Sequence, residues 1–198
     1  VPLFIFMGLV LEKTKIAESL IKDMNALFNK TDSGLAISVV IVGALLAAST
    51  GIVGASVVTL GLLTYPVLIR NGYTSRVASG TICASGTLGQ IIPPSLVLIL
   101  LADVLSSSYQ QAQLNMGIFS PKTITIADLF LGAILPGLLL PILYIIYLKT
   151  LSVKSIEKKS TSKINVSSIV YPLGLMFIVL GSIIFGLATP SEAAGLGA

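Results

Sequence analysis

Long apolar stretches alternate with short polar segments along the whole chain of 198 residues. Charged residues are absent from four of these stretches, which are 33–69, 77–102, 129–148 and 164–191. A helix needs only about 20 apolar residues to cross a bilayer, so each stretch can enter or cross the membrane. The pattern therefore predicts an all-α, polytopic membrane protein that forms a single membrane domain over residues 1–198.

The first part of the chain predicts two further elements. Residues 1–11 are apolar and predict the end of a membrane helix. Residues 12–32 place Ile16, Leu20 and Met24 at helical spacing among charged side chains, which is typical of an amphipathic helix in the membrane interface. An ordinary solvated connecting helix is the alternative. Because the chain begins and ends in apolar sequence, we expect it to be an internal piece of a longer protein.

The stretch 33–69 is too long for one span, yet no polar loop divides it. Each arm around Ser49-Thr50-Gly51 has roughly 17 residues, or about 25 Å of helix, whereas the hydrocarbon core is about 30 Å thick. Basic residues flank both ends, with Lys30 before the stretch and Arg70 after it. Since positive charge marks cytoplasmic segments, we predict a re-entrant helical hairpin with both ends at the cytoplasm.

The distribution of basic residues orients the remaining segments. The segment 103–128 has Lys122 as its only base, whereas 149–166 has five lysines against the single acid Glu157. Because basic loops stay in the cytoplasm, the first segment is predicted to be an external loop and the second a cytoplasmic loop. The predicted order is a discontinuous membrane helix at 77–102, the external loop at 103–128, a membrane helix at 129–148, the cytoplasmic loop at 149–166 and a further membrane helix within 167–198.

Composition supports a membrane protein and excludes several other classes. Hydrophobic residues make up 55% of the chain and charged residues 10%, and the mean hydropathy is +1.00, which lies outside the range of soluble globular proteins. The net charge of +4 comes from lysines in short loops and predicts topology rather than nucleic-acid binding. The chain has no His, and its one cysteine, Cys83, has no neighbour in sequence to activate it. We therefore expect neither an enzyme nor a cofactor.

The stretch 77–102 contains two adjacent prolines that must interrupt a helix. Pro93 and Pro94 have no amide hydrogen, so the carbonyls of Gly89 and Gln90 lose their helical donors. Irregular backbone at membrane depth is tolerated only where it is buried in protein or lines a cavity. Two interruptions close together, here and at Ser49-Thr50-Gly51, are typical of an ion and substrate site in secondary transporters.

The interruption at Pro93-Pro94 can provide a set of uncharged oxygen ligands. Thr87 and Ser95 add hydroxyl groups to the released carbonyls, and Gly86 and Gly89 permit close approach of the backbone. Hard cations such as sodium are suited to such oxygens. The alternative is a structural proline kink in which the hydroxyls bond back to the helix.

Similarity to a known family adds to this interpretation. Three motifs carry it: GALLAASTGIVGA at 43–55, ASGTLGQIIPPS at 84–95 and ATPSEAA at 188–194. They closely resemble the large membrane subunit of TRAP (tripartite ATP-independent periplasmic) transporters. The resemblance implies a sodium-driven importer of organic acid anions, such as dicarboxylates or sialic acid, in the bacterial inner membrane. It also implies two inverted repeats, a periplasmic substrate-binding protein as partner, and a small membrane subunit.

The same resemblance implies the residues of the site. The substrate-binding residues would be Ser49, Thr50 and Gly51. The sodium-binding residues would be Ser49, Gly86, Thr87, Gly89 and Pro93, and the carbonyl released by Pro94 adds Gln90 to them. Sodium would be the coupling ion, and the end of 167–198 would begin the second repeat.

The sequence is also compatible with other functions. The chain could belong to another sodium-coupled anion carrier that also uses hairpins and broken helices, or to a structural subunit of a membrane complex. A membrane-embedded enzyme would need charged or metal-binding groups within its spans, and the charge-free stretches argue against it.

Overall fold

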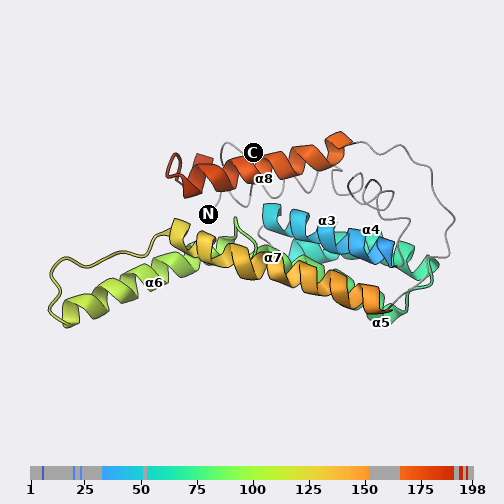
Figure 1. Cartoon of the computed structure of the whole chain (residues 1–198), viewed down its shortest axis with the longest axis horizontal. Helices are drawn as coiled ribbons and strands as arrows, with labels where there is room; N and C mark the ends of the chain where they lie inside the picture. The colour runs from blue at the N-terminus through green and yellow to red at the C-terminus, as the bar shows by residue number, and fades with distance from the viewer. Residues whose placement is uncertain are drawn as a thin grey trace.

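The computed structural model describes residues 33–50, 53–151 and 166–189, together with the single residues 6, 20, 23, 192, 193 and 195. These residues are helical or lie in turns, and no strand occurs among them, so the predicted all-α class is confirmed. The elements are α3 (Gly34–Thr50), α4 (Val53–Arg70), α5 (Ser75–Thr87), the 3₁₀ turn η1 (Leu88–Gln90), α6 (Leu96–Asn115), α7 (Ile126–Leu151) and α8 (Val166–Ile184). Figure 1 shows them as an elongated bundle. Apart from Phe6, Leu20 and Asp23, the predicted segments 1–11 and 12–32 lie outside the described residues, as does most of 149–166.

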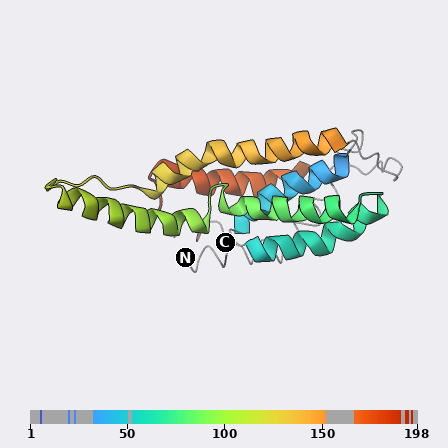
Figure 2. The same ribbon diagram turned by 90° about the horizontal axis from the view of Figure 1, so that it is seen from below.

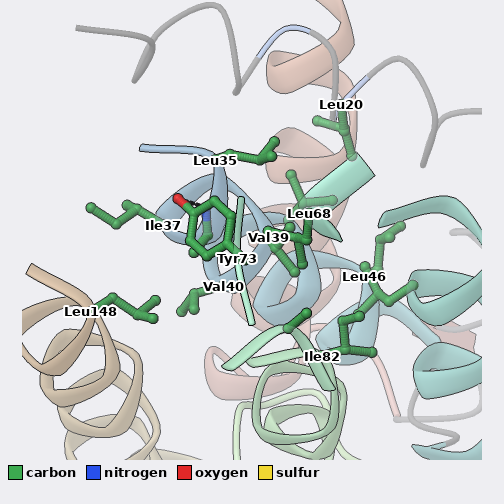
Figure 3. Packing of buried hydrophobic residues seen from close by; sticks show 14 residues of the cluster. Leu20, Leu35, Ile37, Val39, Val40, Leu46, Leu68, Tyr73, Ile82 and Leu148 are labelled. Atoms are coloured by element: carbon green, nitrogen blue, oxygen red, sulfur yellow. Dashed lines mark hydrogen bonds between the residues drawn. The ribbon is translucent and has the colours of Figure 1, made fainter. Parts of the chain in front are cut away.

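Helix α3 forms the centre of this bundle. It contacts α4, α5, α7 and α8, and every side chain from Leu35 to Val40 is buried. A helix that is apolar on all sides needs such neighbours. Figure 3 shows its side chains packed beside Leu68 of α4, Ile82 of α5 and Leu148 of α7.

Helices α3 and α4 lie side by side and run in opposite directions, as both ribbon views show (Figures 1 and 2). Together they occupy the stretch 33–69, with the interruption after Thr50 where the sequence predicts it. The amide of Ala36 near the start of α3 donates to the hydroxyl of Tyr73, just beyond the end of α4, at 3.5 Å. Burial raises the pKa of this phenol, and the hydrogen bond from Ala36 acts in the opposite direction. Entry and exit of the pair on one membrane face remain a prediction.

Glycines with positive φ follow three of the described helices. Gly72 follows α4 with φ 86°, Gly117 follows α6 with φ 80°, and Gly186 follows α8 with φ 68°. After Gly72, the amide of Tyr73 donates to the carbonyl of Leu68 at 3.1 Å, which is the bond of a Schellman cap. Glycine adopts this left-handed conformation without strain, so these turns are fixed by local sequence.

Acidic side chains close the N-terminal end of two helical segments. The carboxylate of Asp128 accepts from the amide and hydroxyl of Thr125, at 3.0 and 2.6 Å, where α7 begins. Glu192 accepts from the amide and hydroxyl of Thr189 in the same way, at 2.8 and 2.7 Å. These are capping boxes. The Glu192 carboxylate, which could otherwise have suggested a functional acid, therefore caps a helix.

Helix α6 is longer than the sequence predicts. The segment 103–128, which is rich in serine and glutamine, is predicted to be an external loop, but α6 continues to Asn115. Its polar side chains support the helix, since Gln110 donates to the Ser106 hydroxyl one turn earlier at 3.1 Å. The loop begins only at Met116, and α6 extends well beyond the other helices in both views (Figures 1 and 2).

Large apolar faces point outward from the bundle. Helices α4 and α7 are long and apolar enough to cross a membrane, and only 22% and 11% of their most apolar stretches are buried. Leu135, Leu138 and Ile142 on α7 are all more than half exposed. The core helix of a soluble protein would be mostly buried, so this exposure agrees with a helical membrane protein.

Candidate functional site

The main irregular feature lies between α5 and α6. α5 ends at Thr87, η1 adds one 3₁₀ turn, and α6 begins at Leu96. The dipeptide Pro93-Pro94 between them is joined by a cis peptide bond. The helix is therefore discontinuous inside the motif 84–95, as its prolines predict. We call residues 88–95 the helix break.

One carbonyl of the helix break is left without a donor. The amides of Ile91 and Ile92 both donate to the carbonyl of Leu88, at 3.0 and 2.8 Å. The next residue, Pro93, has no amide hydrogen to offer. Within the part of the chain that the structure describes, the Gly89 carbonyl consequently accepts no hydrogen bond.

The second predicted free carbonyl is engaged. The hydroxyl of Ser95, which is fully buried, donates to the carbonyl of Gln90 at 2.8 Å. The same hydroxyl oxygen accepts from the amide of Leu98 at 3.3 Å, so Ser95 also caps α6. Ser95 thus replaces one of the donors that the prolines remove. A carbonyl oxygen has two lone pairs, and one on Gln90 is still available to a ligand.

Hydroxyl groups beside the helix break bond back to the helix. Thr87 donates to the carbonyl of Ala84 at 2.9 Å, and Ser85 donates to the carbonyls of Thr81 and Ile82. Such bonds are common for Ser and Thr in membrane helices. They use the hydrogen but leave oxygen lone pairs, and the Thr87 side chain is exposed. Thr87 is therefore free to offer its oxygen to a cation.

Glycines let neighbouring helices approach the end of α5 closely. A methyl group at Gly43 of α3 would lie 2.6 Å from the Cβ of Ser85. A methyl group at Gly86 would overlap the side chain of Val57 on α4 and lie 3.1 Å from its Cα. Small residues are the usual means of close helix packing in membranes, where apolar burial alone gives little drive. α5 is consequently fixed between α3 and α4 directly before the helix break.

Helix α7 supports the helix break from another side. A methyl group at Gly137 would lie 3.3 Å from the Cα of Ile92 and 3.4 Å from the carbonyl oxygen of Ile91. This is tighter than ordinary van der Waals contact, and the neighbour is backbone that cannot rotate away. Gly137 therefore lets α7 pack against the helix break itself.

The C-terminal ends of two helices meet at this place. α3 and α5 run in the same direction (Figure 2), and Gly43 faces Ser85, so the part of α3 after Gly43 extends toward η1, which it contacts. The last carbonyls of a helix lack intrahelical donors and carry a partial negative charge. Two such ends favour a cation between them. Among the described residues, no group of three His, Cys, Asp or Glu side chains could hold a metal ion, so neutral oxygens remain the ligands on offer.

The predicted site residues fall into two groups. Gly86, Gly89 and Pro93 are buried, whereas Thr87 and Gln90 are exposed, and all of these lie at the end of α5 or in the helix break. Ser49 and Thr50 belong to the last turn of α3, but their side chains lie outside what the structure describes. Gly51 lies outside the described residues altogether. The predicted substrate-binding residues therefore stay a prediction.

Sequence reasoning missed Gly43 and Gly137 as positioning residues. Both are single glycines within apolar helices, where glycine weakens the helix by about 1 kcal/mol relative to alanine. A glycine at a position where alanine would stabilise the helix is a sign in the sequence that another part of the protein packs closely there. It could not name the contact partners, because Ser85 and Ile92 lie far away in sequence.

Comparison with known proteins gives matches over the whole chain. The model of the family "Tripartite ATP-independent periplasmic transporter, DctM component" matches residues 1–198. The C4-dicarboxylate TRAP transporter large permease proteins DctM of Vibrio cholerae and Pseudomonas aeruginosa are 31% and 29% identical to the chain. Both alignments cover all of the chain, with 41% and 44% of the relative. The isethionate TRAP transporter permease protein DctMQ of Oleidesulfovibrio alaskensis is 27% identical over all of the chain and 30% of its own length.

The chain thus spans less than half the length of these curated relatives. All three are transporter permeases and none is an enzyme.

Proposed function

Since the chain belongs to the DctM component family of tripartite ATP-independent periplasmic transporters, we propose that it forms part of the large membrane subunit of a sodium-driven importer of organic acid anions. The complete subunit would work in the bacterial inner membrane with a periplasmic substrate-binding protein and a small membrane subunit. The relatives named for C4-dicarboxylates and isethionate transport small anions by their names. An anion of that kind is the substrate class we propose here.

One observation carries the proposal, namely the position of the Gly89 carbonyl. It has no donor within the described chain, it lies in buried backbone, and the C-terminal ends of α3 and α5 approach the same helix break. An unpaired carbonyl in apolar surroundings costs several kcal/mol, on the order of 2 to 7. A bound sodium ion would remove that cost, since carbonyl and hydroxyl oxygens are its natural ligands.

We propose that sodium binds between the helix break and the end of α3. The carbonyls of Gly89 and Gln90 and the hydroxyl oxygen of Thr87 would be ligands on one side, with Ser49 on the other. Gly86 and Pro93 would act through the backbone, Gly86 by close packing and Pro93 by its missing amide hydrogen.

The substrate would bind next to the sodium ion. Ser49 and Thr50 are the last residues of α3, and Gly51 lies between them and the N-terminal end of α4 in sequence. Helix N-termini attract anions. A sodium ion at the end of α3 would neutralise its partial negative charge and so favour a carboxylate nearby. This mutual stabilisation is a coupling free energy between two sites, which is what sodium-driven uptake requires.

The membrane arrangement we propose keeps the predicted topology. α3 and α4 would form a re-entrant hairpin that enters and leaves at the cytoplasm, and the far end of α6 with its loop would face the periplasm. α5, the helix break and α6 would form the discontinuous membrane helix. The parts of the protein beyond this chain would supply the second, inverted repeat.

Uptake by the reconstituted complex tests this function. The complete subunit, its small partner and the binding protein are placed in proteoliposomes, and uptake of a labelled C4-dicarboxylate is followed without ATP. An inward sodium gradient should drive accumulation, and a potassium gradient of the same size should not. Equal uptake with both ions would rule out sodium coupling, whereas no uptake with either would rule out this substrate.

A further inference from the structure

A cavity separate from the helix break opens between α3, α5 and α7. Its volume is about 310 Å³, which is at the lower end of the range for sites that bind organic molecules. Val40 of α3, Val77 of α5 and Leu148 of α7 form much of its wall. Figure 3 shows Val40 and Leu148 facing each other across the junction of their helices.

The wall of this cavity is apolar except at one end. Thr81 is among the lining residues, and its hydroxyl donates to the carbonyl of Val77 at 2.8 Å. Arg76 provides the one cationic group among the lining residues. Its side chain is exposed, and within the described part of the chain it forms no ion pair.

Aromatic residues join Arg76 in the cavity lining. Tyr144 and Tyr147, from the last turns of α7, line the cavity together with Arg76, from the first turn of α5. The start of α5 and the end of α7 lie at the same end of the bundle (Figures 1 and 2). Tyrosine is enriched at membrane interfaces, so this end of the cavity suits the depth of the lipid head groups.

An amphiphile with an anionic head matches these features. The apolar wall, which includes Val40, Val77 and Leu148, can take a hydrocarbon chain. The guanidinium of Arg76 can pair with a phosphate through two parallel hydrogen bonds. Basic pockets between membrane helices on the cytoplasmic side are known lipid-binding features.

We propose that the cavity binds one anionic phospholipid of the inner leaflet, with an acyl chain between α3, α5 and α7 and its phosphate on Arg76. The bound lipid would fill the space between α5 and α7 and so stabilise their packing. This inference is independent of sodium binding, because none of the proposed sodium ligands lines the cavity.

Lipid retention by the complete subunit tests the proposal. The protein is purified in neutral detergent, freed of lipid, and titrated with phosphatidylglycerol or phosphatidylcholine of the same acyl chains. Native mass spectrometry then measures the fraction of subunit with one lipid bound. We expect phosphatidylglycerol to bind about fivefold more tightly, as for one basic residue near an anionic head group.

Matched variants locate the site. Arg76→Gln should abolish the preference between the two lipids. Arg76→Lys should keep part of it, because the charge remains but the paired hydrogen bonds are lost. Arg70→Gln, outside the cavity, should leave the preference unchanged. Gly80 lines the cavity and a methyl group there would meet no atom within 4 Å, so Gly80→Leu should fill space and weaken both lipids. Gly132→Leu on α7, equally open, is its control. Helicity and elution volume establish that each variant is folded.

Three results would overturn the proposal. Equal affinity of the wild-type subunit for both lipids would show that the negative charge of the head group does not contribute to binding. Unchanged binding in Arg76→Gln or in Gly80→Leu would place any bound lipid elsewhere. Absence of lipid from the folded wild-type subunit would mean that another part of the protein or a second copy fills the cavity.

Discussion

Ser95 holds the carbonyl of Gln90 across the helix break, with its hydroxyl 2.8 Å from that oxygen. The two residues lie on opposite sides of Pro93-Pro94. The Ser95 hydroxyl therefore supplies the Gln90 carbonyl with a donor in place of the backbone amide that Pro94 lacks. The neighbouring Gly89 carbonyl has no such partner within the described chain. Of these two carbonyl oxygens in the helix break, that of Gln90 accepts a hydrogen bond and that of Gly89 accepts none within the described chain.

Replacing Ser95 by Ala should loosen the helix break. The variant loses both the bond to Gln90 and the cap on α6, for a destabilisation of about 1 to 2 kcal/mol. Thermal unfolding of the complete subunit in detergent measures this loss. Ser107→Ala is the control, because Ser107 is exposed and bonds only back to its own helix α6. Equal melting temperatures for the two variants would contradict the clamping role of Ser95.

Gly86→Ala and Gly80→Ala should have opposite effects although both lie on α5. A methyl group at Gly86 overlaps Val57, whereas a methyl group at Gly80 meets nothing within 4 Å. Overpacking costs about 1 to 3 kcal/mol, and Ala in an open helix position gains up to about 1 kcal/mol over Gly. Thermal unfolding should thus rank Gly80→Ala above wild type and Gly86→Ala below it. The reverse order would mean that α4 and α5 are not packed as described.

Gly137→Ala should affect sodium use more than folding. The added methyl group presses on the backbone of Ile92 at 3.3 Å and so moves the helix break by a few tenths of an ångström. We expect a severalfold rise in the sodium concentration that gives half-maximal uptake. Gly132→Ala on the same helix has open space and should show no change. Wild-type sodium dependence in the Gly137→Ala variant would contradict the claim that the packing of α7 against the helix break affects sodium binding.

Single cysteines test the proposed topology. In a Cys83→Ala background, Arg70→Cys and Gln111→Cys place thiols at exposed positions at the end of α4 and near the end of α6. We expect a membrane-impermeant maleimide added outside spheroplasts to label Gln111→Cys only. Labelling of Arg70→Cys from outside would exclude a hairpin that returns to the cytoplasm.

The sequence predicts those parts of the fold that depend on covalent chemistry near in sequence. The helix break follows from the missing amides of Pro93-Pro94. Polarity alone misled the prediction at 103–115, because serine and glutamine side chains there bond within the helix and do not end it.

Contacts between distant residues could not be predicted from one sequence. Gly43 and Ser85 meet only because α3 and α5 pack in parallel, and Ser95 reaches Gln90 only because the turn has one particular shape. The roles of Ser49 and Gly51 rest on the family resemblance, and the structure describes neither the Ser49 side chain nor Gly51.

The sodium dependence of uptake in a Pro93→Ala/Pro94→Ala double variant tests the central claim most directly. Alanine at these positions restores amide hydrogens that can bond the carbonyls of Gly89 and Gln90, so the helix can close and withdraw the proposed sodium ligands. Pro66→Ala, at an exposed proline inside α4, controls for the loss of a helix proline elsewhere. Uptake is measured against sodium concentration in proteoliposomes with the complete three-part transporter. The account predicts that the double variant needs at least about tenfold more sodium, or about 1.4 kcal/mol of lost binding, while Pro66→Ala matches wild type. Wild-type sodium dependence in a folded double variant would show that the helix break is a structural kink and not a sodium site.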